Sequence, residues 1–313
     1  MGLCQAQLIT NTLTRPALPQ AVTDHAAAAA AANTSPDLDE RVKEAILHAH
    51  LLDSYQRRLP RVLDVVNNQA GSSRWTTASR KTLNYQLLLL LDQVEGCGLE
   101  RQLVEDSSTT LMLPHGNRLM QMRHDAGYLL SSPDPLPPMA TQGEVLAASE
   151  GEDMPDLYPL SPFSNCRARD TYPTEECYAV DSPHLYPHTI FMHHNQPRMP
   201  HTEDVFKGMS LLYAFSHAAA YAKLVQKHSL GDLDKPITVQ VVHINGPQYH
   251  LGVFQLNTLN LAPSAADKPV RNLFWTQEWE TLFDSCKFKA GRGVLEGYNP
   301  KVFSLLRGLH AQG

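Results

Sequence analysis

The sequence predicts an α+β protein in which an antiparallel sheet and hairpins pack with several helices around one core. Three observations predict it: stretches with helical spacing of apolar residues, stretches with strand-like alternation beside turns, and a long proline-rich segment between them. The chain has 313 residues, of which 42% are hydrophobic, so it can bury a sizeable core. With 19% charged residues, it does not have the composition of a disordered protein.

Composition also excludes two classes of protein. No apolar run approaches the roughly 18 residues that would span a bilayer, and the longest run of leucines is Leu87–Leu91. The formal net charge is -6, which excludes a net basic nucleic-acid-binding protein but not a local basic patch.

Residues 1–36 are expected to form a poorly ordered leader, either a tail or a frayed helix, ahead of a single α+β domain over residues 37–313. The leader contains seven consecutive alanines, Ala26–Ala32, which have no apolar face to bury, and Pro36 ends the run. Residues 1–23 lack the continuous apolar stretch of a secretory signal and hold one arginine, too few to indicate a transit peptide.

Helical periodicity predicts four helices in the domain. The expected helix over residues 37–59 begins with acids, and Pro60 stops it; residues 77–94 carry leucines on one side. Residues 202–228 trace a long apolar face that begins at a capping threonine, and residues 300–310 close the chain.

Alternating residues predict two hairpins and one further strand. Thr109–Leu113 and Arg118–Arg123 flank one turn. Ile237–Ile244 and Gln248–Leu256 flank a second turn at Asn245-Gly246, although Pro247 makes a plain two-residue loop less certain. Asn272–Trp275 is the further strand.

Residues 131–201 are expected to be an acidic, proline-rich, irregular segment lying over the core. Residues 131–204 hold 12 of the 22 prolines, with 12 acids against three bases. Proline has a fixed φ and no backbone N–H, so this stretch should contain no long helix and no central strand. A short helix and an acidic loop are expected over residues 143–156. The aromatic residues expected to pin the segment to the core are Tyr158, Phe163, Tyr172, Tyr178 and Tyr186.

A cluster of histidines raises the question of a metal site. Five fall within eighteen residues, namely His184, His188, His193, His194 and His201. His184 and His188 have the spacing of two ligands on one helix face, but Pro183 and Pro187 prevent a helix there. The five cysteines are scattered without a Cys-x-x-Cys pair, which favours a reducing compartment. We expect no metal and partly exposed loop histidines, with a His-liganded metal enzyme as the weaker alternative.

No motif of a nucleotide-binding protein or hydrolase is present, and the carboxylate pairs fall in expected loops, so we expect no enzymatic activity.

Two clusters of basic residues are a further candidate feature. They are Arg57, Arg58, Arg61, Arg74, Arg80 and Lys81 in the first, and Lys287, Lys289, Arg292, Lys301 and Arg307, with interleaved aromatics, in the second. Such clusters can hold phosphates, but ordinary surface charge is the simpler interpretation.

Six short segments together resemble the mitochondrial large-ribosomal-subunit protein thirty-seven family, over about Leu8 to Leu309. They are Asp134-Pro135-Leu136-Pro137, Tyr158-Pro159-Leu160-Ser161-Pro162, Tyr186-Pro187-His188-Thr189, Leu211-Leu212-Tyr213-Ala214-Phe215, Val253-Phe254-Gln255-Leu256-Asn257-Thr258 and Asn272-Leu273-Phe274-Trp275. No single segment is diagnostic, but the ordered set is quite specific. The Phe-Gln-Leu-Asn-Thr stretch is shared with the paralogue numbered thirty, which is the nearest alternative.

The resemblance implies a structural constituent of the mitochondrial large ribosomal subunit, a ribonucleoprotein of mitochondrial translation in the matrix. It implies an α+β fold without catalytic activity or cofactor, docked mainly on neighbouring proteins, including the homologous thirty subunit, with some contact to mitochondrial rRNA. Candidates for rRNA contact are Arg57, Arg58, Arg61, Arg74, Arg80, Lys81, Lys287, Lys289 and Arg292. Candidates for a partner interface are Phe254, Leu256 and Trp275. A soluble adaptor outside the ribosome is a further alternative, which the acidic proline-rich segment would fit.

Overall fold

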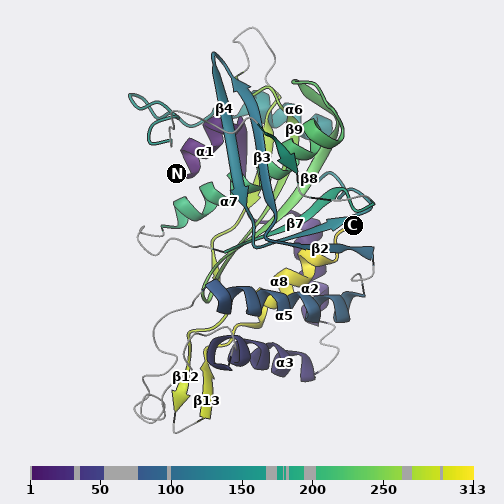
Figure 1. Ribbon diagram of the computed structural model, residues 1–313, viewed down its shortest axis with the longest axis vertical. Helices are drawn as coiled ribbons and strands as arrows, with labels where there is room; N and C mark the ends of the chain where they lie inside the picture. The colour runs from purple at the N-terminus through teal and green to yellow at the C-terminus, as the bar shows by residue number, and fades with distance from the viewer. Residues whose placement is uncertain are drawn as a thin grey trace.

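The computed structural model describes residues 2–31, 36–52, 77–96, 100–166, 175–178, 180, 183–193, 202–262, 270–289 and 292–313. Within them, a mixed sheet of eight strands runs through the molecule with helices on both of its faces (Figure 1). Across the sheet the strands are β1 (Thr12–Pro16), β10 (Asn272–Thr276), β9 (Gln248–Thr258), β8 (Asp232–Asn245), β7 (Tyr186–His193), β5 (Tyr128–Ser132) and β2 (Gln102–Glu105), with the short β11 (Glu280–Thr281) also on β9.

The pairing of these strands confirms the expected α+β class. β1 pairs with β10 and β7 pairs with β8 in parallel. All other neighbours in the sheet are antiparallel, including the long β8–β9 hairpin. The second expected hairpin is therefore present, with its turn one residue later than expected. Asn245 still pairs with Gln248, and the loop is Gly246-Pro247, where Gly246 has a φ of 64°.

Two smaller sheets complete the strands of the described residues. β3 (Ser108–His115) lies between β4 (Arg118–Asp125) and β6 (Cys177–Tyr178), and β12 (Ser285–Lys289) pairs with β13 (Arg292–Glu296). The β3–β4 hairpin confirms the first expected hairpin. The β12–β13 hairpin was not expected, because its lysines and arginine were interpreted only as a basic cluster.

The β8–β9 hairpin is buried on both faces of the sheet. Alternate residues of β9 enter different cores: Tyr249, Leu251 and Val253 enter one, and Phe254 and Leu256 enter the other. Side chains of a strand point alternately to opposite faces, so each face of this hairpin needs its own cover.

Helices supply much of that cover. On one face lie α1 (Leu3–Thr10), α7 (Glu203–Ala220) and the β3–β4 hairpin; on the other lie α2 (Gln20–Ala31), α3 (Pro36–Leu47), α5 (Thr77–Glu95) and α8 (Pro300–His310) (Figure 1). A third, smaller cluster joins α6 (Gln142–Gly151) to β1 and β10. No helix in the described part of the chain has the length and hydropathy needed to cross a bilayer.

The expected helices are confirmed where the structure describes them. The predictions over residues 77–94 and 300–310 correspond to α5 and α8. The long helix expected from residue 202 is α7 with a π-helical turn, η3 (Tyr221–Val225), although the Thr202 side chain makes no capping hydrogen bond. The first expected helix is α3 with the π-helical turn η1 (His48–Leu52), and residues 53–59 lie outside the described residues.

The expectation of a poorly ordered leader is wrong for residues 2–31. They form α1, β1 and α2, and β1 is a parallel neighbour of β10 in the main sheet. Ala26 and Ala29 are buried, and α2 packs so closely on α8 that a Cβ added at Gly308 would lie 3.0 Å from the Ala26 Cβ. The alanine run therefore has a face to bury, because small residues permit this close contact between helices.

The proline-rich segment contains a central strand, which was also not expected. β7 lies between β5 and β8, and most of its side chains are buried. The register against β5 shifts at one point: Leu130 pairs with Thr189, but Ser131 pairs with Pro187. The residue skipped by this shift is His188, and the pairing of β7 with β8 begins only at Thr189, so Pro187 lies beside the bulge and outside the β8 ladder, where its missing N–H is tolerated. The short helix expected over residues 143–156 is confirmed as α6, which has a full capping box.

Leu256→Asp should unfold the protein, because Leu256 has no exposed surface and its replacement would bury an unpaired charge. We expect a loss of several kcal/mol in the free energy of unfolding, measured by urea denaturation. The matched control is Leu119→Asp on β4, whose parent side chain is 73% exposed and should tolerate the charge. Equal midpoints for both variants would contradict the buried position of Leu256.

Candidate functional site: polar clamps, a proline-lined groove and the charged residues

The side chain of Gln255 on β9 clamps the proline-rich segment to the sheet. Its Oε1 accepts hydrogen bonds from the backbone N–H groups of Met139 (2.7 Å) and Ala140 (2.9 Å). Its Nε2 donates to the carbonyl of Ala140 (3.0 Å) and to Oδ1 of Asn257 (2.9 Å). A buried amide that is satisfied in this way fixes a loop that has no strand partner of its own.

A second clamp is made by Asn272 at the start of β10. Its Oδ1 accepts from the backbone N–H groups of Asn257 (2.8 Å) and Thr258 (3.0 Å), and its Nδ2 donates to the carbonyl of Thr10 (2.9 Å). The amide of Asn11 donates to two carbonyls of the chain that leaves β9 and enters β10. Together they tie α1 and β1 to the centre of the sheet.

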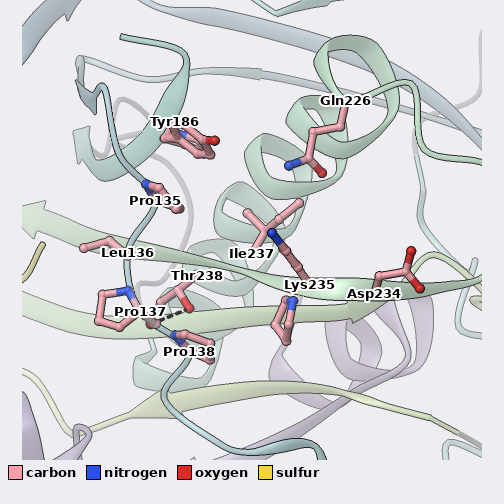
Figure 2. A pocket seen from close by; sticks show the side chains of 12 residues that line it. Pro135, Leu136, Pro137, Pro138, Tyr186, Gln226, Asp234, Lys235, Ile237 and Thr238 are labelled. Carbon is pink, nitrogen blue, oxygen red and sulfur yellow. Dashed lines mark hydrogen bonds between the residues drawn. The ribbon is translucent and has the colours of Figure 1, made fainter.

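A groove of about 320 Å³ lies where the clamped segment crosses the beginnings of β7 and β8 (Figure 2). The hydroxyl of Thr238 closes its floor by donating to the carbonyl of Pro137 (3.0 Å). Its lining is Pro135, Leu136, Pro137, Pro138, Tyr186, Pro187, Gln226, Asp234, Lys235, Pro236, Ile237 and Thr238. Prolines are the most frequent residues in the lining, and its only charged residues are one acid and one base. The groove is therefore better suited to binding an apolar group than to catalysing a reaction.

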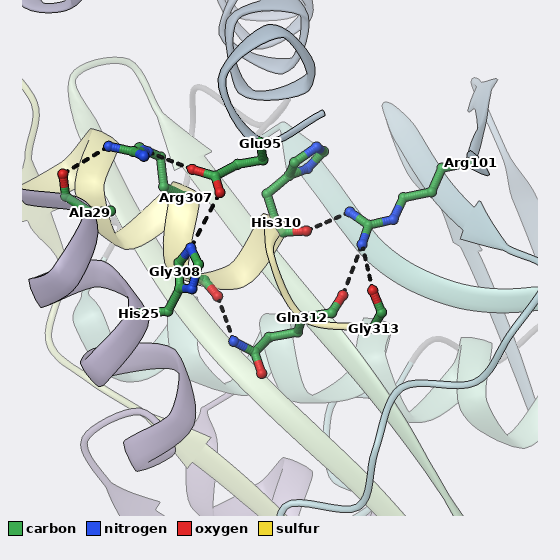
Figure 3. A network of polar contacts seen from close by, with 9 residues as sticks. All are labelled: His25, Ala29, Glu95, Arg101, Arg307, Gly308, His310, Gln312 and Gly313. Atoms are coloured by element: carbon green, nitrogen blue, oxygen red, sulfur yellow. Dashed lines mark hydrogen bonds and ion pairs between the residues drawn. The ribbon is translucent and has the colours of Figure 1, made fainter. Parts of the chain in front are cut away.

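A buried ion pair joins three helices near the C-terminus (Figure 3). Nε of Arg307 on α8 lies 2.6 Å from Oε1 of Glu95 at the end of α5, and each side chain is 10% exposed. Arg307 also donates to the carbonyl of Ala29 on α2 (2.9 Å), and His25 contacts the other Glu95 oxygen at 3.3 Å. Residues from α2, α5 and α8 are thus held by one buried charge pair.

Arg101 holds the residues that follow α8 (Figure 3). Its guanidinium donates to the carbonyls of His310, Gln312 (2.9 Å) and Gly313 (3.4 Å). From the opposite side, Nε2 of His188 on β7 donates to the Gln312 carbonyl over 2.7 Å. These contacts are structural, since every acceptor is a backbone carbonyl.

The histidine-rich stretch does not assemble a site in the part of the chain that is described. His188 is fully buried, so the expectation of a partly exposed loop residue is wrong there; His193 contacts Asn84 at 2.6 Å. His194 and His201 lie outside the described residues. Among the residues that the structure describes, no three His, Cys, Asp or Glu side chains are grouped to hold a metal ion.

The candidate rRNA-contact residues are only partly described. Arg57, Arg58, Arg61 and Arg74 lie outside the described residues, and so do the side chains of Arg80 and Lys289. Lys81 pairs with Asp106 (2.7 Å), and Lys287 lies 3.8 Å from a Glu296 oxygen. Arg292 is exposed on β13. Acids of the chain itself therefore partly neutralise the described members of these clusters.

The three partner-interface candidates differ in their exposure. Phe254 and Leu256 are fully buried in the core, so their side chains face the chain's own elements, and Trp275 is half-buried.

Tyr158 was expected to pin the proline-rich segment to the core, but it is 87% exposed, and Leu160 is 66% exposed. Of the other aromatic residues expected to pin the segment, the three described ones, Phe163, Tyr178 and Tyr186, pack against the core.

Comparison with known proteins confirms the resemblance drawn from the six segments. The family described as "Mitochondrial 28S ribosomal protein S30 (PDCD9)" matches residues 156–310. The class of protein to which this chain is similar is therefore the mitochondrial ribosomal proteins.

The particular relatives are named large ribosomal subunit protein mL37. The protein of Gallus gallus is 24% identical over 333 aligned residues, which cover 100% of this chain and 71% of the relative. The protein of Rattus norvegicus is 31% identical over 169 residues, and that of Bos taurus is 26% identical over 215 residues. These two matches cover 53% and 62% of this chain, and 39% and 48% of the relatives.

Glu95→Ala should strongly destabilise the protein, because it leaves the Arg307 guanidinium buried without its partner. We expect a loss of about 3–5 kcal/mol in the free energy of unfolding. The control is Glu280→Ala, which removes the acid that pairs with the exposed Lys301 and should cost less than about 1 kcal/mol. Similar denaturation midpoints for both variants would contradict the structural role of the buried pair.

Stability should fall as the pH is lowered below about 6.5, because several histidines are buried in their neutral form. Burial lowers the pKa from 6.5 to about 3 for His188 and His250 and to about 4 for His217, which are fully buried, and desolvation also lowers the pKa of the half-buried His124 to about 3. The charges of His217, Arg101 and Lys207 add smaller decreases at His124, His188 and His250. The unfolded chain then binds more protons between these pKa values and 6.5, so acid favours unfolding.

Each of these histidines can add up to about 1.4 kcal/mol per pH unit to the slope of unfolding free energy against pH. His188→Gln should therefore flatten the slope between pH 6.5 and 4, measured by urea denaturation at each pH. The control is His184→Gln, at a half-exposed position. An unchanged slope for His188→Gln would show that this ring does not titrate as its burial indicates.

Proposed function

We propose that this chain is a structural constituent of the mitochondrial large ribosomal subunit and supports mitochondrial translation in the matrix without catalysing a reaction. The observation that carries the proposal is the match to the chicken mL37 protein, which covers the whole of this chain. The order and spacing of the six segments support the same assignment.

The position of those segments supports a scaffold role. Gln255 and Asn272 lie in two of the segments, and their side-chain amides form hydrogen bonds that hold loops and strands of the chain together. His188, in another segment, donates to a backbone carbonyl. Side chains used in this way stabilise one fold, and none of the three is left to act on a substrate.

Docking would be mainly on neighbouring proteins, with limited contact to rRNA. The chain has a net charge of -6, and described bases such as Lys81 pair with its own acids. Where the structure describes bases that pair with the chain's own acids, a polyanionic RNA would gain less from contacting them. The homologous thirty subunit remains the proposed protein neighbour.

One alternative has a specific observation in its favour. The family matched over residues 156–310 carries the description of a 28S ribosomal protein, S30, rather than a large-subunit name. The second candidate function is therefore that of this paralogous mitoribosomal subunit. An adaptor outside the ribosome and a metal enzyme have no such observation behind them.

Sedimentation of mitochondrial lysates through a sucrose gradient tests the proposal. We expect the full chain to migrate with the large subunit and, after monosomes are dissociated by lowering Mg²⁺, to stay with large-subunit rRNA. Recovery with the small subunit would overturn the large-subunit assignment. Recovery only in the light fractions would overturn both ribosomal assignments.

A charge-reduced variant extends this experiment to rRNA contact. Changing Arg57, Arg58, Arg61 and Arg74 to Gln should release the chain at lower KCl concentration, since fewer phosphate contacts weaken binding and its salt dependence. The control changes four bases that pair with acids of the chain: Lys43, Arg123, Lys207 and Lys301. Release of both variants at the same KCl concentration would argue against rRNA contact by the first cluster.

A further inference from the structure

The loop at residues 157–163 presents apolar side chains to solvent. Tyr158 is 87% exposed and Leu160 is 66% exposed, and they are two residues apart. Among the described residues, the other exposed large apolar side chains are Tyr85, Leu89, Leu119 and Leu230. Exposure of such side chains together is unfavourable in water and is typical of a surface that binds another macromolecule.

Hydrogen bonds hold this loop in one conformation. The backbone N–H of Tyr158 donates to Oδ1 of Asp156 (2.8 Å), and that of Leu160 donates to the carbonyl of Leu157 (2.7 Å). The hydroxyl of Ser161 accepts from the N–H of Phe163 (3.2 Å). The exposed side chains are thus presented on a fixed backbone, which lowers the entropy lost on binding.

The end of the loop is anchored to the body of the protein. Nε2 of Gln5 on α1 donates to the carbonyls of Pro162 (2.6 Å) and Ser164 (2.7 Å). The Phe163 ring packs edge-on against His115 at the tip of β3, with centroids 4.9 Å apart, and Arg118 lies over its face at 5.2 Å. Phe163 points into the fold, whereas Tyr158 and Leu160 do not.

Acids precede the exposed side chains in the sequence. Asp153 and Asp156 immediately precede the loop, and Glu152 and Glu150 precede them, whereas no base lies between residues 124 and 166. Arg15 offsets Glu152, with which it pairs at 2.6 Å, and Arg118 lies over Phe163 at the other end of the loop. Asp153 and Asp156, next to Tyr158 in the sequence, would repel phosphates, so this end of the loop is unsuited to RNA and complementary to a basic surface.

We propose that Tyr158 and Leu160 insert into an apolar pocket, rimmed by Lys or Arg, on a neighbouring protein of the particle. The inference rests on the proposed ribosomal function and names the surface by which the chain docks on protein. The apolar pair provides the buried contact area, and the acids fix the orientation of the loop on its basic partner.

Tyr158→Ser combined with Leu160→Ser tests the apolar contact. In full-length chains, we expect large-subunit association at least about tenfold weaker than for the parent, judged from the fraction that co-sediments at increasing dilution. Both positions are exposed, so thermal unfolding should not change. The matched control is Tyr85→Ser with Leu230→Ser, the same residue types at positions that are 42% and 51% exposed.

Asp153→Lys tests the charge and should weaken the association, more at low salt than at high salt. A photoreactive benzoylphenylalanine at position 158 then identifies the neighbour, and the same probe at position 230 is the control. Cross-links from position 158 to a protein, mapped to a segment rich in Lys and Arg, would support the proposal. Cross-links to rRNA alone would overturn it.

The outcomes separate this inference from the proposed function. If the parent chain joins the large subunit and the Tyr158, Leu160 double variant joins it equally well, the docking loop is wrong while the ribosomal role stands. If the parent chain never joins a ribosomal subunit, the proposed function fails and the inference fails with it.

Discussion

The structure depends on burying the β8–β9 hairpin on both of its faces. Residues 237–244 and 249–259 are buried throughout, yet they include polar side chains such as Gln255 and His250. A buried polar group without a partner costs about 1–3 kcal/mol, so these side chains must find partners inside the protein. Gln255 finds them in the proline-rich segment, and His250 finds them in Ser210 and Thr276. The hairpin therefore does more than fill a core: its polar groups determine where distant segments of the chain are attached.

The elements that could be predicted from the sequence are those with a local signal. Leucines at helical spacing predict α5, and a proline at the first helical position with a capping Asn299 predicts α8. β7 was missed because the rule that excludes proline from central strands does not hold at a bulge. The packed state of α2 was not predicted, because Ala26 is buried by close packing against Gly308, which is 282 residues away in the sequence. No local pattern reports such a contact, and the clamps and the Glu95–Arg307 pair share this property.

The charges of the chain show why composition gave little information about function. A run of lysines and arginines in a sequence resembles a surface that binds phosphate, but a charge that already has an acid beside it contributes little to binding another molecule. Arg307, which belongs to the second basic cluster, lies in a buried pair with Glu95, and Lys81 pairs with Asp106. Charge in the sequence therefore does not by itself identify which bases are free to bind another molecule. The acidic segment is different, because its excess of acids is too large for its own three bases to offset.

Five of the six segments that carry the family resemblance separate into two groups once their positions are known. Those on β7, α7, β9 and β10 are buried in the fold, and the clamping residues lie among them, so packing and internal hydrogen bonding account for their residue types. The segment around Tyr158 and Leu160 is held by hydrogen bonds of its own and points its apolar side chains away from the core. Folding gains nothing from those exposed side chains, since a serine would keep the same backbone bonds at lower solvation cost. The proposed contact with another molecule would account for these exposed side chains, and the acids beside them favour a basic protein over nucleic acid as that molecule.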